Sequence, residues 1–353
     1  MNIIFNKGKD WFNKKMPFVI YCKPNSEKII GVFQKNDKLF EINNFTETGF
    51  AFVSFDRKSK YIIPKDQSDV YIETISEIAY FIEKDVDLGF DSVVKLSFEN
   101  LVEKGIKAIQ NKQFEKVVLS RREKLEIDNF DFEKVFSKLI FHYQNTFKYC
   151  FYHPKIGFWI GATPEQFLQS SEKTIKTVSF AGTQPYSETE EYIWQEKEKQ
   201  EQQFVTDFIL DNLQNYCAEI SASKPYTFRA GSIVHIKTDI KAVINSKTDL
   251  QNIIEKLHPT PAVCGLPKDE TMQFIIENEG YDRTFYTGFL GELNIDFATF
   301  QNNKSDLFVN LRCMNIENNF VNLYIGCGIT KDSIPEKEFF ETVNKSKTMK
   351  KVV

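Results

Sequence analysis

Short apolar runs separated by turn residues recur along most of this chain. Between residues 16 and 70, the runs FVIYC, IIGVF, FAFVSF and YIIP alternate with Asn, Lys, Gly and Asp. Runs of this length, bounded by such residues, predict short and mostly antiparallel strands. Three successive strands are expected in FKYCFYHP, IGFWIGATP and TIKTVSFAGTQP, and further strands in 116–127 and around 284–329. The chain is therefore expected to fold around sheets.

A smaller number of segments shows the apolar period of helices. Helices are expected at about 97–112, 131–145, 189–216 and 249–257, and from about 335 to near the end of the chain. No linker rich in Gly, Ser or Pro separates these segments. We predict one α+β domain over 1–353, in which a strand-rich part, 1–95, joins the remainder, 96–353.

Composition limits the class of protein. The 34 Phe and 14 Tyr among 353 residues are enough for a substantial core. The 45 Lys and Arg against 49 Asp and Glu, a net charge of −4, argue against a nucleic-acid partner. Six Cys without a CxxC spacing indicate reduced core thiols. Since no run has the length of a signal peptide or a membrane span, we expect a soluble cytoplasmic protein without a membrane partner.

Two predicted helices each carry an E-x-x-E motif. Glu198 and Glu201 lie three residues apart on one, and Glu338 and Glu341 on the other, where Lys345 follows four residues later. Residues at these spacings share one helix face. Two such faces could converge on Mg²⁺, which prefers oxygen ligands. The alternative is a solvated Glu201 on the first helix and a Glu–Lys surface pair on the second.

Other segments carry weaker signals. Glu165 in GATPEQF is either an ordinary helix-start residue or a placed acid, and Lys116 at the start of an apolar strand is either solvated or functional. The loop HPTPAVCGLP, 258–267, is either a connection or a rigid wall of a site. Gly326 and Gly328 permit close backbone approach to a ligand, but their spacing is not that of a dinucleotide fingerprint.

In this order, the segments resemble one family, the chorismate-utilising enzymes, which include isochorismate, salicylate, anthranilate and aminodeoxychorismate synthases. The resemblance covers about residues 96–353 and rests on FEKVVLSRR, GATPEQFL, FAGT, EKEKQEQQFVTDFI, IVHIKTDI, HPTPAVCGLP, DRTFYTGFLGEL, NLRC and GCGITKDSIPEKEFFETVNK. It implies a large single-domain α+β sandwich of mostly antiparallel β-sheets with helices packed outside.

The resemblance also implies a reaction. Family members that use ammonia usually have Gln at the position of Lys116, or Lys at the position of Ala181; this chain matches the members that use water. Lys116 would then be the general base that activates water for attack at ring C2, and Glu165 the general acid for the hydroxyl leaving C4. Such roles require a neutral lysine and a protonated carboxyl group, whose pKa values are shifted in opposite directions.

Further roles carry over by position. Glu201 and Glu341 match direct Mg²⁺ ligands of the family, and Glu198 and Glu338 match carboxylates that reach the metal through water. Substrate contacts are matched by Arg312, Tyr286, Gly326, Gly328, Lys345, Thr183, His235, Ala262 and Val263. A strand histidine such as His235 is also often only a satisfied core residue.

The leading hypothesis is Mg²⁺-dependent conversion of chorismate to isochorismate for menaquinone or siderophore biosynthesis, by a monomer or homodimer without a glutaminase subunit. The alternatives are a salicylate synthase, which eliminates pyruvate from isochorismate, and a non-catalytic chorismate-binding protein. The chain departs from the family at Gln202, where His is usual, and at Cys327 and Cys264.

Overall fold

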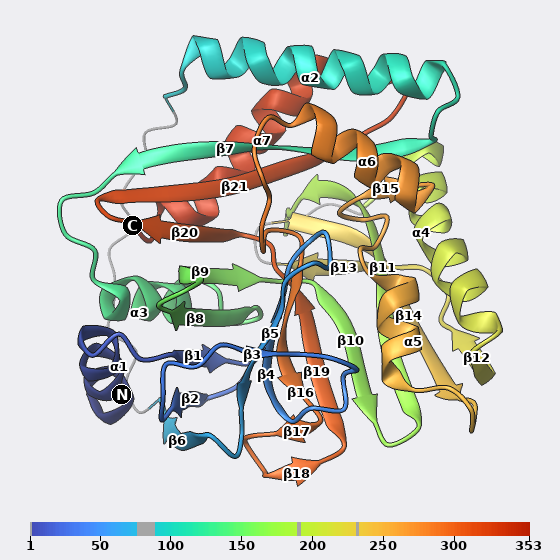
Figure 1. Cartoon of the computed structure of the whole chain (residues 1–353). Coiled ribbons are helices and arrows are strands. Elements are labelled where there is room, and N and C mark those ends of the chain that lie inside the picture. Colours follow the sequence, from blue (N-terminus) through green and yellow to red (C-terminus); the bar gives the residue numbers. More distant parts are fainter. Residues whose placement is uncertain (1, 76–88, 189–191, 231–232) are drawn as a thin grey trace.

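Two large antiparallel sheets form the centre of the computed structural model (Figure 1), which describes residues 2–75, 89–188, 192–230 and 233–353. The first sheet has nine strands in the order β15-β7-β21-β20-β9-β8-β1-β2-β6. These strands are β15 (Gly265–Leu266), β7 (Lys116–Glu126), β21 (Phe320–Ile329), β20 (Cys313–Glu317), β9 (Gly157–Thr163), β8 (Phe147–His153), β1 (Phe18–Cys22), β2 (Lys28–Gln34) and β6 (Ser68–Thr74).

The second sheet has ten strands in the order β12-β14-β11-β10-β19-β16-β4-β5-β3, and β13 pairs with β14 beside this path. The strands are β12 (Cys217–Ala222), β14 (Ile233–Ile244), β11 (Thr174–Pro185), β10 (Gln166–Ser171), β19 (Lys304–Val309), β16 (Phe289–Leu293), β4 (Gly49–Val53), β5 (Lys60–Pro64), β3 (Phe40–Glu41) and β13 (Tyr226–Ala230). A separate two-stranded sheet joins β17 (Ile295–Asp296) to β18 (Gln301–Asn302).

Helices lie outside the sheets (Figure 1). They are α1 (Asn2–Asn13), α2 (Ser92–Gln110), α3 (Phe132–His142), α4 (Glu196–Gln214), α5 (Leu250–Leu257), α6 (Lys268–Asn278) and α7 (Pro335–Lys350). Within the described residues, no helix has the length and apolar character needed to span a membrane. The α+β class with mostly antiparallel sheets is confirmed.

Most predicted helices are present, with shifted ends. Asp91, Asp131 and Asp249 cap α2, α3 and α5 by accepting backbone N–H groups. The helix predicted from about 189 begins only at Glu196, because a capping box between Gln195 and Glu198 starts it there; residues 189–191 lie outside the described part. Helices α1 and α6 were not predicted.

Packing between the sheets is dominated by aromatic rings. Phe52 of β4 stacks on Phe285 with ring centroids 4.2 Å apart, and it also contacts Phe151 of β8 and Trp159 of β9. On the outer face of the second sheet, α4 buries Val205, Ile209 and Leu213 against α5 and the strands, as its apolar stripe predicts. All six cysteines are free and buried, which agrees with the prediction of reduced core thiols.

Strands from the N-terminal part belong to both sheets. β1 pairs with β8 in the first sheet, and β4 pairs with β16 in the second. The part of the chain before residue 75 therefore contributes to the same two layers that carry the later strands.

Candidate active site

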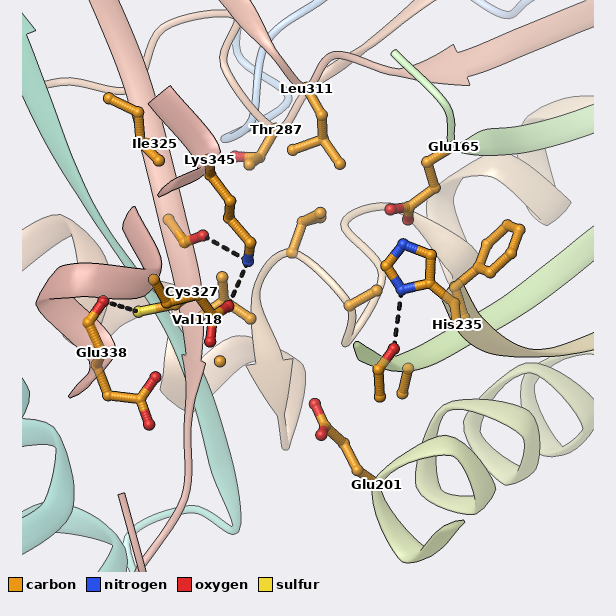
Figure 2. A pocket seen from close by; sticks show the side chains of 18 of the residues that line it. Val118, Glu165, Glu201, His235, Thr287, Leu311, Ile325, Cys327, Glu338 and Lys345 are labelled. Carbon is orange, nitrogen blue, oxygen red and sulfur yellow. Dashed lines mark hydrogen bonds and ion pairs between the residues drawn. The ribbon is translucent and has the colours of Figure 1, made fainter. Parts of the chain in front are cut away.

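A cavity of about 570 Å³ lies between β7 and β21 of the first sheet, β11 and β14 of the second, and the helices α4 and α7. Figure 2 shows Glu165 and His235 on one side of it, Lys345 and Glu338 on the other, and Glu201 reaching toward it from α4. Apart from Thr183, every residue predicted for the site lines this cavity: Lys116, Glu165, Glu198, Glu201, His235, Ala262, Val263, Tyr286, Arg312, Gly326, Gly328, Glu338, Glu341 and Lys345. The backbone of Thr183 belongs to β11, but its side chain lies outside the described part of the structure.

Lys116 is buried and forms an ion pair inside the cavity. It is the first residue of β7. Its side chain is 7% exposed, and its Nζ donates to Oε1 of Glu201 at 2.5 Å. Gly328 on the neighbouring β21 leaves room for this pair, since an added Cβ would lie 3.2 Å from Lys116 Cε and 3.4 Å from Glu201 Oε1. The alternatives of a solvated Lys116 and a solvated Glu201 are therefore wrong.

Glu165 lies in the short segment between β9 and β10. Because the chain continues into a strand, the alternative that Glu165 is a helix-start residue is wrong. Backbone bonds hold it: its N–H donates to Thr163 Oγ1, and its carbonyl accepts from Val309 N at 3.0 Å. Burial raises the pKa of Glu165 to about 7, although Lys116, Lys345 and Arg312 act in the opposite direction. This is the direction that a general acid requires.

Cationic groups gather at the other end of the cavity. Arg312, just before β20, has a φ of 47°, in the left-handed region that few non-glycine residues adopt, and its Nη1 donates to Thr348 Oγ1 at 3.2 Å. Lys345 of α7 donates to the carbonyl of Gly326 at 3.1 Å and pairs with Glu341 at 2.6 Å. A Cβ on Gly326 would lie 2.9 Å from the hydroxyl of Tyr286, so glycine keeps this end open.

His235 of β14 faces the cavity beside Phe180 and Glu165 (Figure 2). Its Nδ1 lies 2.8 Å from the carbonyl oxygen of Gly182. Burial lowers the pKa of His235 to about 4. The ring is therefore neutral at physiological pH, and its Nδ1 donates to that carbonyl because only a protonated ring nitrogen can do so.

The four predicted metal carboxylates point into the cavity from two helices, but each has other contacts. Glu198 accepts from the backbone of Gln195 at 2.9 Å and from Gln184, whereas Glu201 and Glu341 pair with lysines. Within the described ranges, no three His, Cys, Asp or Glu side chains lie close enough together to hold an ion. The donor chemistry of the four residues, carboxylate oxygens from two helices that line one cavity, nevertheless fits Mg²⁺.

Two features beside the cavity were not predicted. Gln202 is buried behind Glu201, and its amide bonds Ser179, Thr206 and Thr238. Glu279 and Arg283 form a buried ion pair next to Val118 and Val263. Spacing gives no signal for either, because Gln, Ser, Thr and Glu are mostly exposed residue types.

Comparisons with known proteins agree with this architecture. Residues 73–353 match the family model described as chorismate binding enzyme. Isochorismate synthase MenF of Escherichia coli (strain K12) is 28% identical over 265 residues, 71% of this chain and 59% of that protein. Anthranilate synthase component 1 of Aquifex aeolicus is 27% identical over 73% of this chain and 53% of that protein.

A solved structure, described as a putative 2,3-dihydroxybenzoate-specific isochorismate synthase, DhbC, from Bacillus anthracis, superposes with a TM-score of 0.78 at 23% identity. The match covers 96% of both chains and shows a shared fold. The chain spans 53% to 66% of the length of the first curated relatives that it matches. The family model covers most of the chain and agrees with the resemblance seen in the sequence, so the chain belongs to the chorismate-binding enzyme family.

Proposed function

We propose that this chain converts chorismate to isochorismate. The observation that carries the proposal is that a buried amine, Lys116, and a carboxyl group whose pKa is raised to about 7, Glu165, line one cavity. A base and an acid facing one bound ring are what the exchange of two hydroxyl positions requires. Similarity to the isochorismate synthase MenF supports the same reaction.

In the proposed reaction, the neutral amine of Lys116 takes a proton from a water molecule as the water oxygen bonds to ring C2. The ring double bonds shift, the C4–O bond breaks, and Glu165 donates a proton so that the hydroxyl leaves as water. One water is consumed and one is released. The proton gained by Lys116 and the proton lost by Glu165 are then exchanged with solvent. The ion pair between Lys116 and Glu201 has to separate before the amine can act.

The carboxylates of α4 and α7 support a Mg²⁺ requirement. In this proposal Glu201 and Glu341 bind the ion directly, and Glu198 and Glu338 contact it through water. A bound Mg²⁺ would neutralise a substrate carboxylate and take the place of Lys116 and Lys345 as the counter-charge of the two direct ligands. Arg312, whose guanidinium suits a planar carboxylate, and Lys345 would hold the anionic substrate in place.

The 258–267 loop favours a reaction that stops at isochorismate. Salicylate formation needs a second step, loss of pyruvate, and the loop contributes only the apolar side chains of Ala262 and Val263. The proton of the Thr287 hydroxyl, which also lines the cavity, is already donated to the carbonyl of Tyr286. Ammonia chemistry, as in anthranilate synthases, is not favoured because Lys116 stands where those enzymes usually have Gln.

Product analysis tests the proposal. The purified chain with Mg²⁺ is incubated with chorismate, the products are separated by chromatography, and pyruvate is measured with lactate dehydrogenase. We expect a mixture of chorismate and isochorismate with little pyruvate. Stoichiometric pyruvate without an added lyase would favour the salicylate synthase reading, and unchanged chorismate would favour a binding protein.

A further inference from the structure

A buried ion pair braces the wall of the cavity without lining it. The side chains of Arg283 and Glu279 are 2% and 0% exposed, and Nε of Arg283 donates to Oε2 of Glu279 at 2.7 Å. Ion pairs buried this completely are costly unless further hydrogen bonds satisfy both partners. Here the remaining donors and acceptors of the pair are directed at cavity-wall segments.

Arg283 joins two of these segments. Its Nη2 donates to the carbonyl of Val118 on β7 at 2.7 Å, and its Nη1 donates to the carbonyl of Val263 in the 258–267 loop at 3.0 Å. Nη1 also contacts Thr287 Oγ1 at 3.2 Å. Val118, Val263 and Thr287 all line the cavity, and Figure 2 labels Val118 and Thr287 there.

Glu279 holds the same edge of β7. Its Oε1 accepts from the backbone N–H of Ser120 at 2.7 Å and from the Ser120 hydroxyl at 2.9 Å. The neighbouring strand β15 pairs with only two residues of β7, Lys116 and Val117. One more backbone hydrogen bond follows, from Val118 N to the carbonyl of Cys264, the residue just before β15. Beyond that point, Arg283 donates to the carbonyl of Val118, and Glu279 accepts from the N–H of Ser120. The backbone of a longer strand would have provided the same donor and acceptor.

We propose that Glu279 and Arg283 are positioning residues that replace a strand beside β7 and so fix both Lys116 and the loop of Ala262 and Val263. Lys116, Val118 and Ser120 occupy every second position at the start of β7. A shift of the backbone at 118–120 would therefore also displace Lys116, two residues before Val118. The inference depends on the proposed function for Lys116, but the brace itself can be measured without activity.

Arg283→Lys tests the proposal. Lysine keeps the charge beside Glu279, but its compact ammonium group cannot reproduce the planar fork that reaches Glu279, Val118 and Val263 together. We expect kcat to fall about 10- to 100-fold while KM for chorismate changes by less than about 3-fold, because the loss is one of alignment. Hydrogen exchange should rise in peptides covering 116–121 and 262–264.

Glu292→Gln is the matched control. Glu292 is also a buried carboxylate paired with a lysine, Lys23, but it joins β1 to β16 and lies outside the cavity lining. This variant should leave both kcat per folded molecule and the exchange at 116–121 unchanged. If Arg283→Lys fails to fold, Glu279→Gln provides the same readouts.

Unchanged exchange at 116–121 in a folded Arg283 or Glu279 variant would overturn the brace. Increased exchange with wild-type kcat would overturn its link to Lys116. If wild-type protein makes no isochorismate, the proposed function fails while the exchange result still decides whether the brace exists.

Discussion

Lys116 and Glu165 face the same cavity but are held differently. Lys116 is paired with a carboxylate at 2.5 Å. Three cationic side chains surround the Glu165 carboxyl group, but within the described residues none of them forms an ion pair with it. Glu165 is held instead through its backbone, by Thr163 and Val309. In the proposed reaction Lys116 therefore has to leave its ion pair before it acts, whereas Glu165 is positioned through its backbone.

Replacing either group should stop the reaction. We expect Lys116→Ala and Glu165→Gln each to lower kcat by about 10²–10⁴-fold, the usual contribution of a general base or acid, while chorismate binding stays measurable by calorimetry. Lys148→Met is a matched control, because Lys148 is a buried lysine that binds carbonyls of the 143–144 turn away from the cavity. Near wild-type turnover in both site variants would move the chemistry to other residues.

The raised pKa of Glu165 also predicts a stability effect. Its ordinary value is 4.5 and its value in the folded chain is about 7, so ionisation in the folded state is penalised. The penalty is absent below about pH 4.5, grows as pH rises, and is complete above about pH 7. Glu165→Gln, which cannot ionise, should therefore be more stable than wild type by about 1–3 kcal/mol at pH 8 and nearly equal to it at pH 4.5.

Thermal melts at the two pH values measure this difference. If Glu165→Gln were destabilised at pH 8, or if its advantage were the same at both pH values, the assignment of the raised pKa to Glu165 would be incorrect.

At the scale of elements, α4 and α7 bring their E-x-x-E faces to one cavity. We expect Glu201→Gln and Glu341→Gln each to weaken Mg²⁺ binding and chorismate binding together, and excess chelator to abolish activity. Titration calorimetry with Mg²⁺ alone checks the binding, and Glu196→Gln, an exposed acid in the first turn of α4, is the control. Full turnover in chelator, with metal content shown to be nil, would exclude the metal.

Sequence periodicity identified the elements with clear apolar stripes or caps, such as α3, α5 and β7. It missed α6, which buries little more than Thr271 and Ile275, and α1 at the start of the described chain. The sequence also supplied, through the family motifs, the predicted site residues, all of which except Thr183 line the cavity; it did not single out other lining residues such as Phe180 and Leu311. It could not show that Lys116 pairs with Glu201, 85 residues away, or that Arg283 contacts Val118, since such contacts arise from the packing of distant elements.

At the scale of the whole molecule, the site depends on both sheets. The first sheet supplies Lys116, Gly326 and Gly328, and the second supplies His235 and the β11 wall. Strands from the first 74 residues lie in both sheets, and the aromatic layer between them connects these strands to Trp159 and Phe285. The relative placement of Lys116 and Glu165 is therefore a property of the assembled sandwich.

In the proposed reaction, water adds at ring C2 while the C4 hydroxyl departs. Conversion of chorismate in H₂¹⁸O, followed by mass spectrometry of isochorismate during early turnover, is the decisive test. We expect one ¹⁸O in each isochorismate formed, located in the C2 hydroxyl. Isochorismate that forms without ¹⁸O would contradict it, because the hydroxyl would then have moved within the molecule and Lys116 would not act on water.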